Sequence, residues 1–272
     1  MRLVTLRREG GTKAGRVEGD SVVLLEHASV GRLLESPDWR RLAEVDGERI
    51  AFDPVSLAPV VLDPGKVICV GLNYSKHIVE MGRELPQSPT LFTKFSSSLC
   101  GPTDPIELPK ESAKVDWEAE LAVVIGSQAR RVPAERALDH VAGYTVMNDV
   151  SMRDWQNRTT QWLAGKAWDA SSPLGPVLVT ADELPEGACG LHISCTVNDE
   201  VVQDDNTDDL LFGVAALIAD ISTFTTLQPG DVIATGTPGG VGAGRTPPVF
   251  LAAGDRLRTQ IEGIGSLDNL LV

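Results

Sequence analysis

The segment from residue 115 to residue 125 constrains the fold most, because two glutamates alternate at the start of its apolar run. It reads V-D-W-E-A-E-L-A-V-V-I, which places Glu118 and Glu120 just before an uninterrupted apolar stretch. Such a stretch is typical of a buried strand. Residues i and i+2 of a strand point to the same side, so we expect both carboxylates on one face at the entrance to an apolar core. Like charges held close together repel unless a cation joins them, and hard divalent ions favour oxygen ligands, so the segment predicts a metal site.

Asp149 is the candidate third ligand, because it follows G-Y-T-V-M-N at the end of another predicted strand. Three carboxylates and water suit Mg²⁺ or Mn²⁺ and leave positions for a chelating substrate. The alternative is that Glu118 and Glu120 form the solvated face of an edge strand, with Asp149 capping the next helix. Spacing alone does not separate the two interpretations.

A candidate general base lies on the predicted helix 74–81. His77 and Glu80 are neighbours on one helix face, and a carboxylate beside an imidazole raises its basicity, which suits activation of water. An ordinary surface pair is the alternative.

Several polar side chains are candidates for substrate contact. Lys166, between a glycine and Ala167, could neutralise a substrate carboxylate or a developing enolate. Arg153 and Gln156 follow Asp149 closely enough to reach the same ligand, and Lys94 is a further candidate. Each could instead be a surface residue. The glycine-rich segment 235–242 contains neither a phosphate-binding nor a dinucleotide-binding pattern, so it predicts a tight turn or close backbone approach to a small ligand.

Composition excludes some partners. The chain has 272 residues, a formal net charge of −14 and a pI of about 4.7, which argues against binding to nucleic acid or to an anionic membrane. An acidic substrate would need local cations for capture. The first ten residues lack a secretory signal, and no stretch reaches the roughly 18 apolar residues of a membrane span. The four cysteines form no C-x-x-C pair, which favours reduced thiols and a cytoplasmic protein.

The order of predicted elements indicates an α+β, mostly β fold. We expect a small N-terminal α+β domain over 1–63 and a larger domain over 64–272, separated by a proline-punctuated linker. Strands are predicted within 2–25, at 117–125 and at 143–147, and a hairpin over 191–203; helices are predicted at 30–35, 38–44, 133–140, 151–162 and 207–224. Regular strand–helix alternation is missing, so a parallel α/β fold is not expected.

Taken together, these segments resemble the fumarylacetoacetate hydrolase family from about residue 66 to residue 269. The motifs that carry the resemblance, in order, are G-L-N-Y-S-K-H-I-V-E-M-G (71–82), P-T-L-F-T-K-F (89–95), D-W-E-A-E-L-A-V-V-I-G (116–126), G-Y-T-V-M-N-D-V-S-M-R-D-W-Q (143–156), G-K-A-W-D (165–169), L-Q-P-G-D-V-I-A-T-G-T-P-G-G-V-G (227–242) and I-E-G-I-G-S-L-D-N (261–269). Their shared order overrides the alternatives that each motif leaves open by itself.

The resemblance implies a catalytic domain built as a mixed β-sandwich roll, and a homodimer. It implies Mg²⁺ or Mn²⁺ on the three acidic residues, and a His77–Glu80 dyad on a segment that closes over substrate. Positions that contact a bound 2-oxo acid match Lys166, Arg153, Gln156 and Thr237. One departure is Ala167, Trp168, Asp169 and Ala170, where many members have Ser or Thr, Phe, Asp and Thr; because these positions border the substrate in the family, we expect an altered acyl half of the pocket.

The predicted function is metal-dependent hydrolysis of a C–C bond in an acylpyruvate such as fumarylpyruvate, giving pyruvate and a carboxylic acid in aromatic catabolism. The metal and Lys166 would stabilise the enolate, and His77 would deliver water. The same site could serve a decarboxylase or an isomerase acting on oxaloacetate, 5-oxopent-3-ene-1,2,5-tricarboxylate or 2-hydroxyhepta-2,4-diene-1,7-dioate. A non-catalytic binding protein is a further alternative, which the intact triad, dyad and lysine disfavour.

Overall fold

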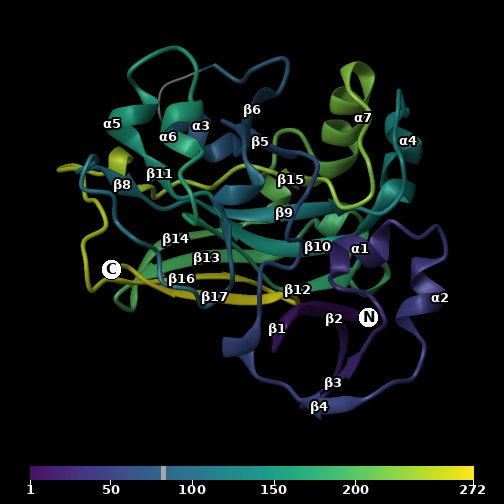
Figure 1. The fold of residues 1–272 in the computed structure, drawn as a ribbon. Helices are drawn as coiled ribbons and strands as arrows, with labels where there is room; N and C mark the ends of the chain where they lie inside the picture. Colours follow the sequence, from purple (N-terminus) through teal and green to yellow (C-terminus); the bar gives the residue numbers. More distant parts are fainter. Residues whose placement is uncertain (81–83) are drawn as a thin grey trace.

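The computed structural model describes residues 1–80 and 84–272, and two packed β-sheets form its centre (Figure 1). The large mixed sheet has the strand order β4-β3-β2-β1-β12-β10-β9-β15-β5-β6. Its strands are β1 (Arg2–Arg8), β2 (Gly11–Glu18), β3 (Ser21–Leu24), β4 (Arg49–Ala51), β5 (Val67–Gly71), β6 (Thr90–Lys94), β9 (Ala119–Ile125), β10 (Val141–Asn148), β12 (Ser172–Thr180) and β15 (Val232–Ala234), with β7 (Leu99–Cys100) paired to β12. The α+β, mostly β prediction is therefore confirmed.

A second sheet covers one face of the large one and has the order β14-β13-β16-β17 (Figure 1). Its strands are β13 (His192–Val197), β14 (Glu200–Asn206), β16 (Arg256–Ile261) and β17 (Gly265–Leu270), and β8 (Val115–Asp116) pairs separately with β11 (Ser151–Met152). The helices are α1 (Val30–Leu34), α2 (Trp39–Ala43), α3 (Ser75–Glu80), α4 (Ala134–Ala137), α5 (Arg153–Gln156), α6 (Leu163–Lys166) and α7 (Val214–Phe224). Within the described residues, no helix combines the length and apolar character needed to cross a bilayer.

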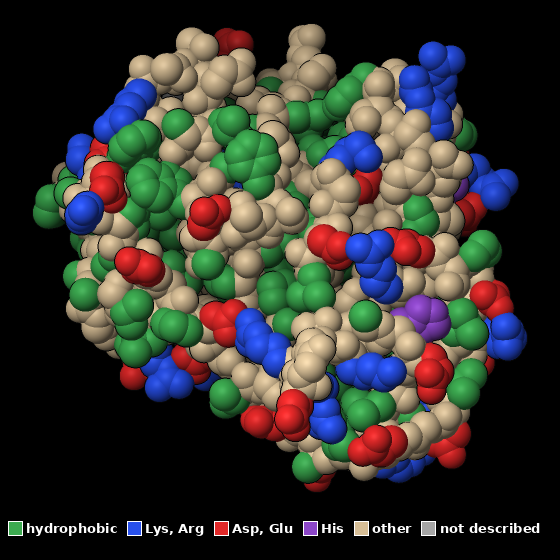
Figure 2. All heavy atoms as spheres, viewed as in Figure 1, with side chains coloured by type: hydrophobic (Ala, Val, Ile, Leu, Met, Phe, Trp, Pro, Cys, Tyr) green, Lys and Arg blue, Asp and Glu red, His purple; other side chains and the backbone are tan. Residues whose placement is uncertain are grey.

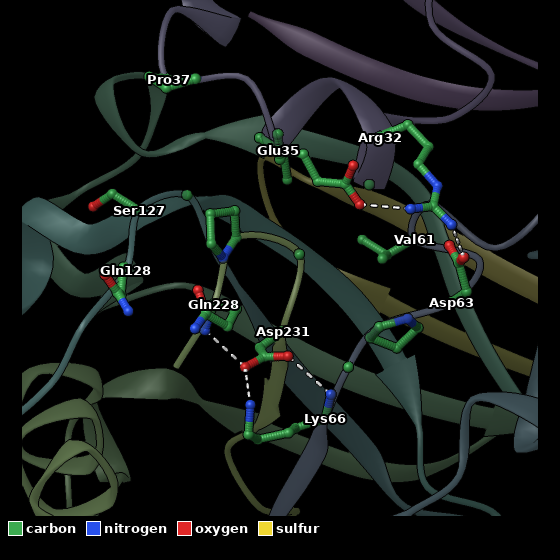
Figure 3. A pocket seen from close by; sticks show the side chains of 17 residues that line it. Arg32, Glu35, Pro37, Val61, Asp63, Lys66, Ser127, Gln128, Gln228 and Asp231 are labelled. Carbon is green, nitrogen blue, oxygen red and sulfur yellow. Dashed lines mark hydrogen bonds and ion pairs between the residues drawn. The ribbon is translucent and has the colours of Figure 1, made fainter. Parts of the chain in front are cut away.

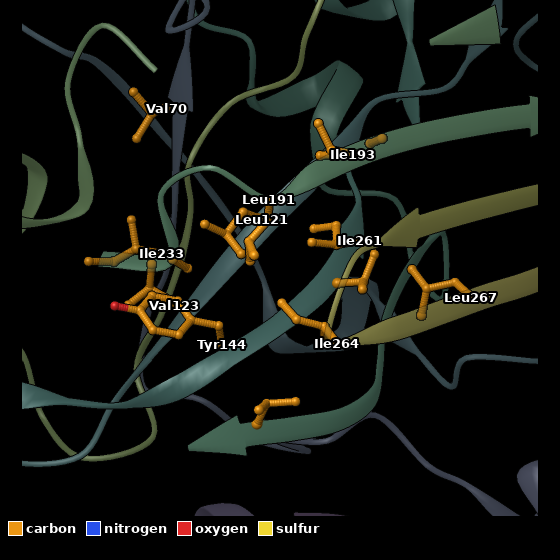
Figure 4. Packing of buried hydrophobic residues seen from close by; sticks show 14 of the residues in the cluster. Val70, Leu121, Val123, Tyr144, Leu191, Ile193, Ile233, Ile261, Ile264 and Leu267 are labelled. Carbon is orange, nitrogen blue, oxygen red and sulfur yellow. The ribbon is translucent and has the colours of Figure 1, made fainter. Parts of the chain in front are cut away.

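Strand β9 is buried on both faces, which explains its continuous apolar sequence. Leu121 and Val123 point into the core between the two sheets, together with Tyr144 and Ile193 (Figure 4). Val124 points the other way, into a second core that includes residues of α1 and α2. The strand is thus held in the middle of the molecule, and its N-terminal end carries the acidic residues.

The N-terminal residues extend the large sheet. Strand β1 pairs with β12 in antiparallel register, Leu3 opposite Leu178, and both side chains lie in the core cluster that also contains Leu33 of α1. The domain boundary at residue 63 stays a prediction.

Two predicted helices are shorter than expected. The segment 151–162 contains β11 and the one-turn α5 instead of a single helix. The segment 207–224 begins with a 3₁₀ turn at Thr207–Asp209 and becomes α-helical only at Val214. The residues before Val214 contact the start of α3: the backbone N–H of Lys76 donates to the Asp209 carboxylate at 3.0 Å, and Leu210 forms a bridge with Tyr74. Tertiary contacts therefore override the local helical pattern.

Candidate metal centre

Glu118, Glu120 and Asp149 meet at the end of β9, as the sequence predicts. One carboxylate oxygen from each residue lies within 4.8 Å of the others. All three residues are buried; Glu118, the most accessible, is 7% exposed. Glu120 belongs to β9, and Asp149 directly follows its neighbour β10. Three buried carboxylates at this spacing can hold one metal ion.

A break in the strand, not a continuous strand, places Glu118. Strand β8 ends at Asp116 and β9 begins at Ala119, so Glu118 lies between them. Its backbone N–H donates to Asn148 Oδ1 at 3.0 Å, and that of Ala119 donates to Gln203 Oε1 at 2.9 Å. Side-chain amides thus replace the ladder hydrogen bonds missing at the break.

Two buried lysines and an arginine surround the carboxylates. Lys166 Nζ lies 2.5 Å from Glu118 Oε2 and 2.9 Å from Asp149 Oδ2. Lys94 Nζ lies 2.6 Å from Asp149 Oδ1, and Arg153 Nη2 lies 2.7 Å from Glu118 Oε1. Because an isolated buried charge is costly, these cations offset the cost of burying Glu118 and Asp149.

The pKa values of the acids diverge in this environment. Burial favours protonation of Asp149, but Lys166 and Lys94 overcome it and lower its pKa to about 2. Burial, followed by repulsion from Asp149 and Glu118, raises the pKa of Glu120 well above the usual glutamate value. Asp149 is therefore a fixed anion, whereas Glu120 is the carboxyl group that gains most from a further cation.

The residues fit a divalent ion. Glu120 Oε1 is buried and has no hydrogen-bond partner among the described residues, while Oε2 accepts the backbone N–H of Gly236 at 2.9 Å. Gly236 has a φ of +104°, which a residue with a Cβ rarely adopts. The orphaned oxygen and the oxygen-only ligand set match the preference of hard cations.

A cavity of about 470 Å³ opens beside the triad. Glu118, Glu120, Lys166, Arg153, Gln156 and Thr237 line it, together with Val70, Gly71, Leu72, Phe92, Asn157, Trp162, Val241, Ala243 and Gly244. The cavity thus joins the acidic residues to most of the predicted substrate-binding residues.

Comparison with known proteins agrees with the family resemblance of the sequence motifs. The family description "Fumarylacetoacetate (FAA) hydrolase C-terminal" matches residues 66–272. The chain belongs to the fumarylacetoacetate hydrolase family.

Among its relatives, a mitochondrial oxaloacetate tautomerase of Xenopus laevis is 50% identical over 80% of this chain and 69% of its own length. The structure of the fumarylacetoacetate hydrolase from Exiguobacterium antarcticum is 37% identical and covers 100% of this chain and 99% of its own, with a TM-score of 0.89. The maleylpyruvate hydrolase of Sphingobium sp. SYK-6 is 33% identical over 100% of this chain and 99% of its own, with a TM-score of 0.82. A family enzyme is therefore supported, but these relatives differ in the reaction named.

The other predicted site residues differ in whether they reach the cavity beside the triad. Gln156 Oε1 accepts a hydrogen bond from Arg153 Nη1 at 2.9 Å, and Thr237 Oγ1 accepts one from Gln203 at 2.8 Å. The side chain of Lys94 is fully buried behind Asp149 and does not line the cavity. His77 and Glu80 belong to α3, but their side chains lie outside the described part of the chain.

The departure from the family pattern at 167–170 lies outside this cavity. Ala167, Trp168 and Asp169 line a separate surface hollow of about 510 Å³, where Trp168 packs edge-on against Trp155 at 5.2 Å. None of these residues lines the cavity beside the triad, where Trp162 stands, so the expectation that they border the substrate stays a prediction.

Sequence reasoning missed three buried residues that organise the site. Asp116 accepts hydrogen bonds from Arg153 Nε at 2.7 Å and from the backbone N–H groups of Gly242 and Ala243. Asn148 and Gln203 hold the strand break. Asp116 and Asn148 stand beside predicted ligands in the sequence, which is a usable signal, whereas Gln203 has no such signal.

A larger cavity of about 680 Å³ lies at the opposite end of β5, β9 and β15 (Figure 3). Its buried acid, Asp231, accepts hydrogen bonds from Lys66 Nζ at 2.9 Å and from the backbone N–H groups of Lys66 and Gln228. Arg32 pairs with Glu35 and Asp63. Because the charged groups there already have protein partners, volume alone does not make it the reactive site.

Proposed function

We propose that this enzyme interconverts the keto and enol forms of a small 2-oxo dicarboxylic acid of the oxaloacetate type, with Mg²⁺ or Mn²⁺ as cofactor. The observation that carries the proposal is the buried carboxylate triad with Lys166 beside it in an open cavity. The reaction is chosen from the 50% identity to a protein named oxaloacetate tautomerase.

The charges explain how an acidic protein captures an acidic substrate. Four carboxylates, on Asp116 and the triad, face three cations, so the fully ionised cluster has a net charge of −1. A divalent ion, when bound to Glu118, Glu120 and Asp149, turns this to +1 and supplies a Lewis acid that favours the enolate of a 2-oxo acid. The local charge therefore opposes the repulsion from the chain's net −14.

The protein's own groups would position the substrate and stabilise the charge that develops. The pKa of Lys166 is raised because its burial is outweighed by Asp149 and Glu118, so its ammonium stays charged and can stabilise an enolate oxygen. Arg153, Gln156 and Thr237 are the proposed partners of the second carboxylate, since they line the same cavity. We assign proton removal at C3 to His77, oriented by Glu80.

The test follows the enol band of oxaloacetate in the ultraviolet with metal-loaded protein, and product analysis accompanies it. We expect faster enol-to-keto conversion without release of pyruvate. A Lys166→Met variant should lose most of this acceleration. An unchanged ketonisation rate with intact metal binding would contradict the proposal.

Acylpyruvate hydrolysis is the second candidate, because a maleylpyruvate hydrolase covers the whole chain in structure. Hydrolysis needs an activated water in addition to the enolate step, so it depends on His77 more specifically. Incubation with fumarylpyruvate should yield pyruvate and fumarate if this candidate is right, and His77→Ala should abolish that cleavage. Cleavage by the variant at the wild-type rate would exclude this role of His77.

We also propose that the protein forms a homodimer, because one part of its surface exposes a group of hydrophobic side chains. Figure 2 shows hydrophobic side chains gathered over α5 and α6, and Phe95 and Leu163 of the surface hollow are 53% and 39% exposed. Elsewhere on this face acidic and basic side chains are mixed (Figure 2). An apolar surface of this kind favours association with another protein surface.

A further inference from the structure

Trp162 rests directly on the backbone of Gly71. A Cβ added to Gly71 would lie 2.3 Å from Cζ3 and 2.8 Å from Cη2 of the indole ring, far inside van der Waals contact. Gly71 ends β5, and both residues line the cavity beside the carboxylate triad. The absence of a side chain at position 71 is therefore what allows the indole to lie there.

Phe92 continues this surface toward the charged groups. The rings of Phe92 and Trp162 meet edge to face with centroids 5.4 Å apart, and Lys166 Nζ lies 4.9 Å from the Phe92 centroid. We call the two rings the aromatic wall. A substrate whose 2-oxo oxygen meets Lys166 thus lies beside the aromatic wall.

We propose that Trp162 determines the length of the 2-oxo acids that the cavity accepts, and that it excludes chains longer than a four-carbon diacid. This rests on the proposed function for the position of the 2-oxo acid head. The charged and polar groups of the cavity can take both carboxylates of a short diacid, whereas a longer chain must extend along the apolar lining, where the indole stands. In an apolar pocket, each methylene that does not fit changes affinity by roughly tenfold or more.

Trp168 provides a matched control from the same segment. It lies six positions further along the chain, yet it faces the separate hollow and donates its indole N–H to the Ala164 carbonyl at 2.8 Å. A change at Trp168 should therefore alter the surface and leave the aromatic wall in place.

The test measures binding instead of turnover, so that it does not depend on which reaction the enzyme catalyses. Calorimetry with metal-loaded protein gives the Kd for 2-oxobutanoate and for 2-oxooctanoate. Trp162→Ala should tighten binding of the longer acid by about tenfold or more and change that of the shorter by less than about threefold, with Trp162→Phe in between. Trp168→Phe should match the wild type for both acids. An unchanged ratio in Trp162→Ala, or an equal shift in Trp168→Phe, would overturn the proposal.

A double-mutant cycle tests the contact itself. Gly71→Ala should lower the Tm and weaken 2-oxobutanoate binding in the wild-type background, because the indole must move. In the Trp162→Ala background the same methyl group has lost its closest neighbours, so Gly71→Ala should have little further effect. Equal effects in the two backgrounds would show that the indole does not rest on Gly71. If oxaloacetate is not tautomerised but the binding ratio shifts as expected, the proposed function fails and the role of Trp162 stands.

Discussion

Lys94 and Asp149 form an ion pair in which both side chains are completely buried, with Nζ and Oδ1 2.6 Å apart. Lys94 comes from β6, at the edge of the large sheet, and Asp149 follows β10 near its middle. The pair therefore connects the carboxylate triad to a distant part of the sheet. Buried pairs of this kind contribute little net stability by themselves, but breaking one leaves an uncompensated charge.

We predict that Lys94→Met destabilises the metal-free protein by about 3–5 kcal/mol, as measured by denaturant unfolding. The pKa of Asp149 is lowered to about 2 by Lys166 and Lys94 against the effect of burial, so its stabilising contribution is present above the usual value of 3.8 and lost as pH falls through about 2. Without Lys94 that loss should begin at a higher pH. Arg136→Met, which breaks an exposed pair with Asp139, should cost less than about 1 kcal/mol. A similar small effect at Lys94 would argue against the buried pair.

Metal binding should release protons, because Glu120 must ionise to bind the ion. Burial and repulsion from Asp149 and Glu118 raise its pKa in the metal-free protein. Protonated Glu120 therefore makes its whole contribution to folding stability below pH 4.5, the usual glutamate pKa. That contribution is lost as the pH rises through the raised pKa of the folded protein. Mn²⁺ affinity should increase over the same rise.

Calorimetric titration with Mn²⁺ in buffers of different ionisation enthalpy measures the released protons directly. Glu120→Gln should bind Mn²⁺ more weakly and release fewer protons than the wild type. Equal proton release by the two proteins would assign the titration to another group.

Asp116 should control the substrate-binding residues without contacting the substrate. Its carboxylate holds Arg153 and the backbone of Gly242 and Ala243. Asp116→Asn removes one of the two charge partners of Arg153 and leaves it held by Glu118 alone, so kcat/KM should fall by roughly 10- to 100-fold, with a large share in KM. Asp154→Asn, next to Arg153 on α5, weakens contacts with Ser112 and Ala113 away from the cavity and should change kcat/KM by less than about threefold. If both variants behave alike, Asp116 has no special positioning role.

The proposed dimer should depend on the apolar hollow over α5 and α6. Phe95→Ser combined with Leu163→Ser removes its most exposed apolar groups, and light scattering should then report a monomer at concentrations where the wild type is a dimer. Val55 is 73% exposed in the N-terminal region, and Val55→Ser should leave the dimer intact. A wild type that is monomeric throughout would remove the basis of this prediction.

The fold class and the carboxylate triad could be predicted from sequence because their signals are local. The apolar run at 121–125 predicts a strand buried on both faces, with Glu118 and Glu120 just before it and Asp149 after the next strand. The predicted single strand over 117–125 and the long helix over 207–224 were wrong in detail. At the first place the side chain of Gln203 takes the backbone N–H of Ala119, which a regular strand would have used. At the second, the carboxylate of Asp209 accepts the backbone N–H of Lys76 and so holds the start of the predicted helix against α3.

The chemistry of the oxygen ligands was therefore determined by the sequence alone, since it resides in the residue types of two short segments. Only the tertiary structure decided that Lys94 is a buried counter-ion of Asp149. It also decided that Gln203, 84 residues from Ala119 in sequence, supports the strand break, and that Trp162 and not Trp168 borders the cavity. Those outcomes depend on which distant segments pack together and on the small volume left above Gly71. The local sequence pattern predicts neither the pairing of segments nor that volume, because both are set by packing of the whole chain.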